Sequence, residues 1–424
     1  MAAKPILEET SGSGAMIDGL AGWQDGEPGA DTELSARARP ERRLAIYPAS
    51  AGFDLVEELD FLCKRTIEPN VFFNPRFLAP AMPRLEDREI RLAVIRDGGD
   101  HRSRLRLLVP FSVEAPVVPL GVPTLRAWSS PFGPLGTPLV DEDDPQGVLE
   151  DFFAMLARPH LKLPKAFVLP DVRLDGPFAE TLRAVAERQG LALETVGKVE
   201  RPFLQSTLEG DAYLRNSLRA HHFREFRRLK RRLEVQGPVD HLVLRDPQEI
   251  RVGVEVFLSL EAAGWKGRAR SAMATDRFRA AFAREAISRL AEQDLARVHL
   301  LRVGERVIAA LVVFIERGIG YTWKTAYDEE FAVFSPGTLL MIEVTRLHLA
   351  DRGIAATDSC AVPDHPVMSR LWSERMPIGT FVVGLEPGRD KPVAQAARQL
   401  ELYRNTRNQV RLVRNRLKTL LRRR

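Results

Sequence analysis

Cysteine is almost absent from this chain, which has only Cys63 and Cys360 among its 424 residues. Two cysteines cannot build a disulfide framework or a cysteine-based zinc site, and such sparse use is typical of a protein in a reducing cytoplasm. Long apolar runs are missing as well. The longest, residues 307–315, has the length of a strand, whereas a membrane-spanning helix needs roughly 20 residues. No basic segment followed by an apolar one opens the sequence, so we expect no secretory signal and a cytoplasmic location.

Several motifs of common enzyme classes are also missing. The sequence contains no Gly-x-Ser-x-Gly elbow, no Walker loop and no dinucleotide fingerprint. His221, His222 and His365 have no partners at metal-ligand spacing, so no metal site is expected. These absences argue against serine hydrolases of the elbow type, P-loop nucleotidases and zinc enzymes.

Positive charge is concentrated at one end of the chain. The formal net charge is +5, yet residues 391–424 hold 11 Lys/Arg against one acid, Glu401. The remainder is therefore slightly acidic. A pI of 9.3 does not describe a uniformly basic surface, and nucleic-acid binding would have to rest on local patches.

The first half of the chain alternates short apolar runs with helical spacing. Residues 1–42 carry Gly, Ser, Ala and scattered charge without a period, and we expect a mobile leader there. Strands are predicted at 44–47, 90–95 and 105–113. The Gly- and Pro-rich segment 129–138 is interpreted as a surface connection.

The second half begins with a basic helix predicted over 211–235, in which eight Arg or Lys residues surround an apolar stripe. Such a helix either presents a solvated face or binds an anion. Three strands follow at 296–303, 306–316 and 319–326, joined by turns tight enough for antiparallel hairpins. A helix is predicted from Ser335 to Arg352, and an Arg-rich amphipathic helix over 393–421.

The turn that opens the helix at Ser335 is a candidate anion site. A helix N-terminus presents free backbone N–H groups and the positive end of the helix dipole, which together suit a phosphate. Ser335 and Thr338 can add hydroxyl donors, and Gly337 leaves the backbone approachable. Ser-Pro-Gly is also simply a good helix start.

Three clusters in this half carry a family resemblance. They are Ala262-Ala-Gly-Trp-Lys-Gly267, Trp323-Lys-Thr-Ala-Tyr-Asp-Glu-Glu-Phe331 with Phe334-Ser-Pro-Gly337, and Asp358-Ser-Cys-Ala-Val-Pro-Asp-His-Pro366. In this order they resemble the CelD/BcsL-type acetyltransferases, a branch of the GNAT acyltransferases associated with exopolysaccharide and cellulose operons. The resemblance covers about residues 201–385.

The resemblance implies a fold of the α/β (α+β) class. Peptidoglycan aminoacyl transferases, larger relatives of this branch, carry two tandem GNAT-like subdomains with mixed, largely antiparallel sheets flanked by helices. The expected organisation is a leader (1–42), an N-terminal GNAT-like subdomain (43–203), a C-terminal GNAT acyltransferase domain (204–385) and an Arg-rich amphipathic helical tail (386–424).

The resemblance also implies an activity. An acyl group, expected to be acetyl, would move from acyl-CoA (acetyl-CoA) to an amine or hydroxyl of a sugar or polysaccharide precursor. The pyrophosphate of the co-substrate would lie on Ser335, Gly337 and Thr338. The Arg/Gln-x-x-Gly-x-Gly/Ala loop of simpler GNAT enzymes is absent. Two alternatives therefore stay open: an aminoacyl-tRNA donor, and a non-catalytic scaffold in exopolysaccharide synthesis.

Acyl transfer needs a proton acceptor and a group that stabilises an oxyanion. The candidate bases are Asp328, Glu261 and Asp358, and Lys324 or a strand amide near Trp323 is the candidate for the positive end. The candidate substrate-binding residues are Trp265, Lys266, Trp323 and Tyr327. Each has a structural alternative, because carboxylates cap turns and tryptophans anchor cores. No covalent nucleophile stands out, and Cys360 ends an apolar strand, so direct attack in a ternary complex is expected.

The basic tail has three possible partners on this evidence. Its apolar stripe and net positive charge suit an anionic membrane surface, which would place the protein peripherally at the inner face of a membrane. RNA or an acidic protein would serve equally well. The sequence does not determine the oligomeric state.

Overall fold

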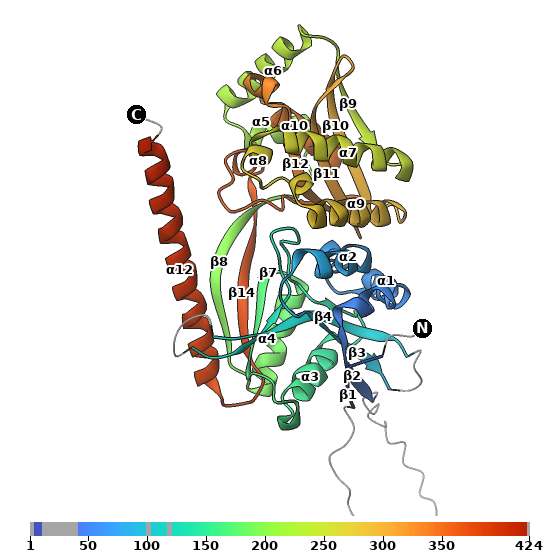
Figure 1. Cartoon of the computed structure of the whole chain (residues 1–424), viewed down its shortest axis with the longest axis vertical. Coiled ribbons are helices and arrows are strands. Elements are labelled where there is room, and N and C mark those ends of the chain that lie inside the picture. The colour runs from blue at the N-terminus through green and yellow to red at the C-terminus, as the bar shows by residue number, and fades with distance from the viewer. Residues whose placement is uncertain (1–3, 11–40, 99–102, 117–120, 422–424) are drawn as a thin grey trace, which may run out of the picture.

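The computed structural model of the chain describes residues 4–10, 41–98, 103–116 and 121–421. One 14-stranded mixed sheet runs through the molecule, with helices on both faces (Figure 1). The first half of the chain supplies β1 (Leu7–Thr10), β2 (Arg42–Pro48), β3 (Arg91–Asp97), β4 (Leu105–Glu114), β5 (Thr124–Ala127), β6 (Leu139–Val140), β7 (Ala166–Arg173) and β8 (Leu193–Leu204). The second half supplies β9 (Val239–Leu244), β10 (Ala296–Val303), β11 (Arg306–Glu316), β12 (Ile319–Tyr327), β13 (Ala356–Asp358) and β14 (Glu374–Gly384).

The helices divide in the same way. The first half holds α1 (Val56–Arg65), α2 (Pro75–Leu85), α3 (Pro145–Leu156) and α4 (Pro177–Gln189). The second holds α5 (Gly210–Ser217), α6 (Ala220–Glu234), α7 (Pro247–Ala263), α8 (Trp265–Arg268), α9 (Arg277–Ala291), α10 (Pro336–Ala350), α11 (Met368–Leu371) and α12 (Asp390–Leu421). No helix in the described ranges has the length and apolarity that crossing a membrane requires.

The sheet repeats one strand pattern twice. After the edge strand β1, its order reads β2-β3-β4-β5-β7-β14 from one end, and it reads β9-β10-β11-β12-β13-β8 from the other. Each series is antiparallel apart from one parallel pair at the same place, β5 with β7 and β12 with β13. The structure therefore confirms a mixed, largely antiparallel α/β fold with two tandem halves.

The last strand of each half crosses to the other. β8 closes the first half of the chain but pairs with β13, and β14 closes the second half but pairs with β7. The two long strands also pair with each other and link the halves (Figure 1). The predicted division at residues 203 and 204 therefore cuts between elements that depend on each other. The domain boundary stays a prediction, and it does not account for the exchange of β8 and β14 between the halves.

The central core lies between the halves. The apolar faces of α2 and α9 meet there, and the rings of Phe77 and Phe282 pack edge to face with centroids 5.1 Å apart. Both faces of β11 (Arg306–Glu316) are covered by other parts of the protein, and its sequence is accordingly almost continuously apolar. Burial of this shared core joins the halves into one body.

Two sequence expectations differ from the structure near the ends of the halves. Residues 1–42 were expected to lack structure, yet Leu7–Thr10 forms β1 on the edge of β2; residues 11–40 lie outside the described ranges. The single helix predicted over 211–235 is two helices, α5 and α6. Leu218 between them has an extended backbone and a buried side chain, so tertiary packing breaks a helix that no Gly or Pro interrupts.

Candidate active site

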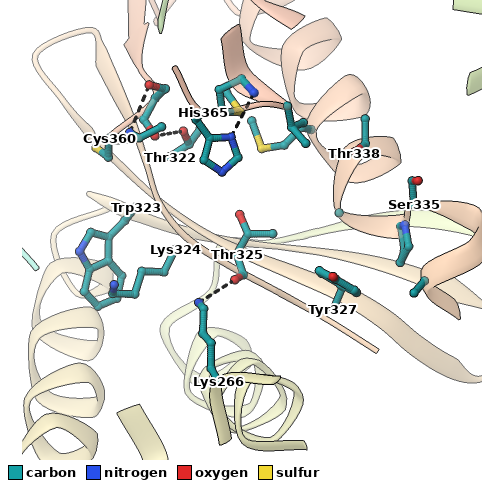
Figure 2. A pocket seen from close by; sticks show the side chains of 18 of the residues that line it. Lys266, Thr322, Trp323, Lys324, Thr325, Tyr327, Ser335, Thr338, Cys360 and His365 are labelled. Carbon is teal, nitrogen blue, oxygen red and sulfur yellow. Dashed lines mark hydrogen bonds between the residues drawn. The ribbon is translucent and has the colours of Figure 1, made fainter. Parts of the chain in front are cut away.

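A cavity lies beside β12, beyond its short pairing with β13. This parallel pairing covers only residues 319–321 and 356–358, after which β13 ends and β12 continues to Tyr327. The volume of the cavity is about 480 Å³. The start of α10, the edge of β12, the chain after β13 and the start of α8 line it (Figure 2).

A β-bulge shapes the wall that β12 contributes. Val312 of β11 lies opposite Lys324 and Val313 lies opposite Thr322, so Trp323 is an extra residue without a ladder partner. A bulge re-aims the side chains around it, and such bulges are frequent beside active sites. Here it brings the adjacent Trp323 and Lys324 both to the lining of the cavity.

The N-terminus of α10 faces the same cavity. Ser335 lies in the left-handed region with φ of 53°, Pro336 begins the helix, and no side chain caps this described end. Gly337 has room around it, because an added Cβ would lie 3.6 Å from the Tyr327 ring and 3.8 Å from Thr325. Ser335, Gly337 and Thr338 all line the cavity, so the helix end is not blocked by side chains.

The corresponding helix end in the first half is occupied. Asp144 precedes α3 with nearly the same backbone angles as Ser335, and Pro145 follows it. The Asp144 carboxylate accepts the N–H of Gly147 at 3.1 Å and pairs with Arg42 at 2.8 Å. An acidic side chain thus already takes the place that an anion would need there.

Lys324 is a half-buried amine in the cavity wall. Its Nζ lies 4.6 Å from the ring centre of Phe132 and 5.6 Å from that of Trp323. Burial, followed by the charge of Lys266, lowers the pKa of Lys324 to about 8. No carboxylate among the described side chains forms an ion pair with it. Near neutral pH a fraction of this amine is therefore uncharged and able to accept a proton.

Lys266 is held by Glu261. The buried Glu261 carboxylate accepts a hydrogen bond from Lys266 Nζ at 2.8 Å, and its second oxygen accepts the N–H of Met273 at 2.8 Å. Lys266 Nζ also lies 3.4 Å from the carbonyl oxygen of Thr325 (Figure 2). With both oxygens engaged, Glu261 orients a charged lysine rather than serving as a base itself.

The other two predicted bases, like Glu261, lie outside the cavity lining. Asp328 caps the 3₁₀ turn after β12 by accepting the N–H of Glu330 at 3.0 Å, and it pairs with Arg306. Asp358 is buried, pairs with Arg201 at 2.9 Å and accepts the N–H of Cys360 at 2.8 Å. Both carboxylates are therefore engaged in contacts that stabilise the local structure.

All four predicted substrate-binding residues, Trp265, Lys266, Trp323 and Tyr327, line the cavity. Trp265 is 54% exposed, so it is not a core anchor. Trp323 is buried, and its indole N–H donates to the carbonyl oxygen of Phe132 at 2.6 Å. Trp323 therefore both anchors the core and forms part of the cavity wall.

The sequence reasoning missed three residues of this site. Phe132 belongs to the segment 129–138, which was interpreted as a surface connection but packs against Trp323 and Lys324. Thr322, whose hydroxyl donates to the carbonyl oxygen of Ser359 at 3.0 Å, and His365 line the side of β12 away from Lys266 (Figure 2). No local pattern could find Phe132, because it reaches Lys324 only through tertiary packing.

Cys360 also lines the cavity, but burial raises the pKa of its thiol well above the usual value. The thiol is therefore protonated and a poor nucleophile. No group of three or more His, Cys, Asp or Glu in the described part of the chain is placed to hold a metal ion.

Residues 220–364, which include α6 to β13, match the family model described as an acetyltransferase (GNAT) domain. A conserved protein of unknown function from Bacteroides thetaiotaomicron VPI-5482 is similar in structure, with a TM-score of 0.50 and 11% identity over 78% of this chain and 97% of that one. FemX is similar with a TM-score of 0.51 and 12% identity over 80% of this chain and 97% of its own. No curated protein matches the sequence.

At these identities the two structures show a common fold alone, whereas the family match concerns the region that holds the cavity. Residues 220–364, which hold the uncapped helix end and most of the cavity lining, are therefore similar to a GNAT acetyltransferase domain.

Proposed function

We propose that this protein transfers an acyl group, acetyl in the first instance, from acyl-CoA to an amine or hydroxyl acceptor. The observation that carries the proposal is the uncapped N-terminus of α10, which opens on the cavity beside β12. The main-chain N–H of Gly337, the hydroxyls of Ser335 and Thr338 and the helix dipole suit the pyrophosphate of CoA. The main-chain N–H groups of Ser335 and Thr338 already donate to the carbonyl oxygens of Ala332 and Ser335. Asp144 fills the corresponding place in the first half, which favours one donor site per chain.

The residues support direct transfer. Bound acyl-CoA supplies an activated thioester carbonyl. The uncharged form of Lys324 accepts the proton that the attacking amine or hydroxyl loses. We assign the stabilisation of negative charge on the carbonyl oxygen to a strand amide near Trp323 and to the ammonium of Lys266, which lines the cavity. The leaving thiol takes up a proton as it departs, so no covalent enzyme intermediate is required.

For the acceptor we propose a sugar or polysaccharide precursor. The resemblance to the CelD/BcsL branch favours a sugar or polysaccharide precursor. Trp265 at the mouth and Tyr327 in the wall offer aromatic faces, which suit the apolar faces of a sugar ring. We propose an amino sugar or sugar nucleotide as the first acceptors to test.

The test measures release of free thiol from acetyl-CoA in the presence of amino sugars or sugar nucleotides, with binding of CoA followed by calorimetry. We expect saturable CoA binding and acceptor-dependent thiol release. Absence of CoA binding at millimolar concentration would overturn the acyl-CoA version. If CoA binds but Lys324→Ala and Gly337→Asp leave the cellular phenotype intact, the scaffold alternative is favoured.

An aminoacyl-tRNA donor is the second candidate, favoured by the basic surface of α5 and α6 beside the cavity. Seven of its arginines are exposed: Arg215, Arg219, Arg224, Arg227, Arg228, Arg231 and Arg232. Arg232 lies over the ring of Phe334, which immediately precedes Ser335. This charge exceeds what one pyrophosphate needs, and a polynucleotide would use it.

Salt dependence separates the two donors. RNA held by this surface should bind with an affinity that falls steeply with salt, and Arg227→Ala with Arg231→Ala should reduce both the affinity and the slope. CoA binding at α10 should change little in the same variant. Deleting residues 391–424 tests whether the tail contributes to RNA binding. Binding of the tail to an anionic membrane surface stays a prediction.

A further inference from the structure

A second cavity of about 220 Å³ lies at the other end of α10. It is bounded by the last turn of α10 and by β9, β10 and β11 of the sheet below. α10 spans 15 residues, or about 22 Å at the helical rise, so this distal cavity is well separated from Ser335. Nothing in the proposed acyl transfer uses it.

Two buried histidines line the distal cavity with unused ring nitrogens. His299 and His348 are 3% and 4% exposed. Nδ1 of His299 lies 3.1 Å from Nε2 of His241, and Nδ1 of His348 lies 2.8 Å from the hydroxyl of Thr357. Nε2 of each is buried without a hydrogen-bond partner in the described chain. A buried polar atom left unpaired is costly, so these two atoms indicate a missing partner.

The chemistry of the two rings favours an acceptor as that partner. Burial lowers the pKa of both, to about 4 for His348 and well below the usual value for His299, so the rings are neutral near pH 7. A neutral imidazole whose Nδ1 accepts a hydrogen bond carries its proton on Nε2. When the hydroxyl of Thr357 and Nε2 of His241 donate to the adjacent Nδ1, each ring offers its Nε2–H to a ligand, and this is the tautomer that we assign.

Positive charge at the mouth adds to this preference. Arg245 is exposed and forms no ion pair with a described residue. Arg297 uses Nη1 on Asp294, while its buried Nε has no partner in the described chain. Asp294 already pairs with Arg297, and Asp351 and the carbonyl end of α10 oppose an anion, so the attraction for a single negative charge comes from Arg245 and the two N–H donors.

The rest of the lining is apolar and comes from Val243, Ile315, Leu347 and Ile354. We propose that the distal cavity is a binding site for a small organic carboxylate with a compact apolar body. Its carboxylate lies against Arg245, His299 and His348, and its body lies against the aliphatic side chains. This site does not take part in acyl transfer, and its test is separate from the test of the proposed function.

The test is calorimetric titration of the full chain with benzoate, and with inorganic phosphate as a wholly polar anion, at constant ionic strength in chloride. The background variant Gly337→Asp prevents phosphate from binding at the N-terminus of α10. We expect one saturable site that prefers benzoate. Arg245→Ala should weaken binding about tenfold, the worth of one charge-assisted hydrogen bond. The matched control is Arg251→Ala, an exposed arginine of α7 outside the cavity, which should leave binding unchanged.

His348→Leu removes one donor and should also weaken benzoate binding, with folding checked by circular dichroism. Because that substitution lies in the core, Arg245→Ala at the surface is the deciding variant. No saturable binding of either anion, or equal affinity in Arg245→Ala and in the background protein, would overturn the proposal and leave ordered water as the partner of the two rings. A preference for phosphate over benzoate would overturn the carboxylate assignment.

Discussion

Lys324 shows how a single residue acquires reactivity from its surroundings. Its strand position is evident in the sequence, but its pKa of about 8 depends on burial, on Lys266 nearby and on the ring of Phe132 from the other half. The sequence suggested Lys324 as the positive group and three carboxylates as bases. The observed contacts favour Lys324 as the base, because the carboxylates are engaged and Lys324 forms no ion pair with a described residue.

We predict that Lys324→Met lowers the rate of acyl transfer by about 10² to 10⁴, the usual contribution of a general base. In the unchanged protein the rate should rise with pH through an apparent pKa of about 8, as the amine loses its proton. Steady-state kinetics from pH 6 to 9 measures both effects. Lys324→Arg retains the charge but cannot act as a base, so activity in that variant would contradict the assignment.

Glu316 couples the halves through a buried contact. Its carboxylate accepts a hydrogen bond from Asn74 Nδ2 at 2.8 Å, and burial raises its pKa from 4.5 to about 7 despite that bond. Because the folded-state pKa exceeds the unfolded value, the folded chain holds this proton more tightly. The stability it contributes is therefore full below pH 4.5 and is lost as pH rises through 7.

We predict that Glu316→Gln, which keeps an acceptor for Asn74, matches the unchanged protein at pH 4.5 and is more stable at pH 8. The gain should reach up to about 3 kcal/mol. Denaturant unfolding at several pH values gives the difference in the free energy of unfolding between the two proteins. The contributions of the other titrating groups are the same in both and cancel in this difference. An equal loss of stability at every pH would mean that the charge of Glu316 is not the cause.

At the scale of elements, α10 has a cavity at each of its two ends. Its start was predictable, because Ser335-Pro-Gly is a local signal for helix initiation and the following apolar spacing is regular. What the helix end faces was not predictable locally. The opening depends on the short pairing of β12 with β13 and on the absence of a capping side chain there, in contrast to Asp144 at α3.

We predict that Gly337→Asp abolishes CoA binding without unfolding the protein. The new Cβ fits at 3.6 Å from Tyr327, and an acid in the first turn favours the helix by about 0.3 to 1 kcal/mol. Its carboxylate repels the pyrophosphate. Gly337→Ala is the matched control and should retain binding, since it adds the Cβ without charge. Calorimetry with CoA measures binding by both variants, and thermal unfolding shows whether both remain folded.

At the scale of the whole molecule, the exchange of β8 and β14 makes the halves mutually dependent. A fragment ending at residue 203 would lack β14, and a fragment beginning at 204 would lack β8. Each would expose the edge of an unfinished sheet. The shared core of α2 and α9 would be opened as well.

We therefore predict that residues 1–203 and 204–424 are each insoluble or unfolded when produced alone and recover native circular dichroism when produced together. The full chain should unfold in one calorimetric transition, because neither half survives loss of the other. Two transitions, or a soluble folded fragment on its own, would show that the exchange is not essential.

Local pattern was sufficient for elements whose stabilising contacts lie close in the chain. The strands at 296–303 and 306–316 were predicted with the bounds they have, since apolar runs and short Gly-containing turns define hairpins over a few residues. The three clusters in the sequence also contain most of the residues that line the cavity in the second half, but not Thr322. Packing alone determined the place of β14, the contact of Phe132 with Lys324 and the partners of Glu261, Asp328 and Asp358. These depend on residues far apart in the chain, and no short window of sequence contains both members of such a pair.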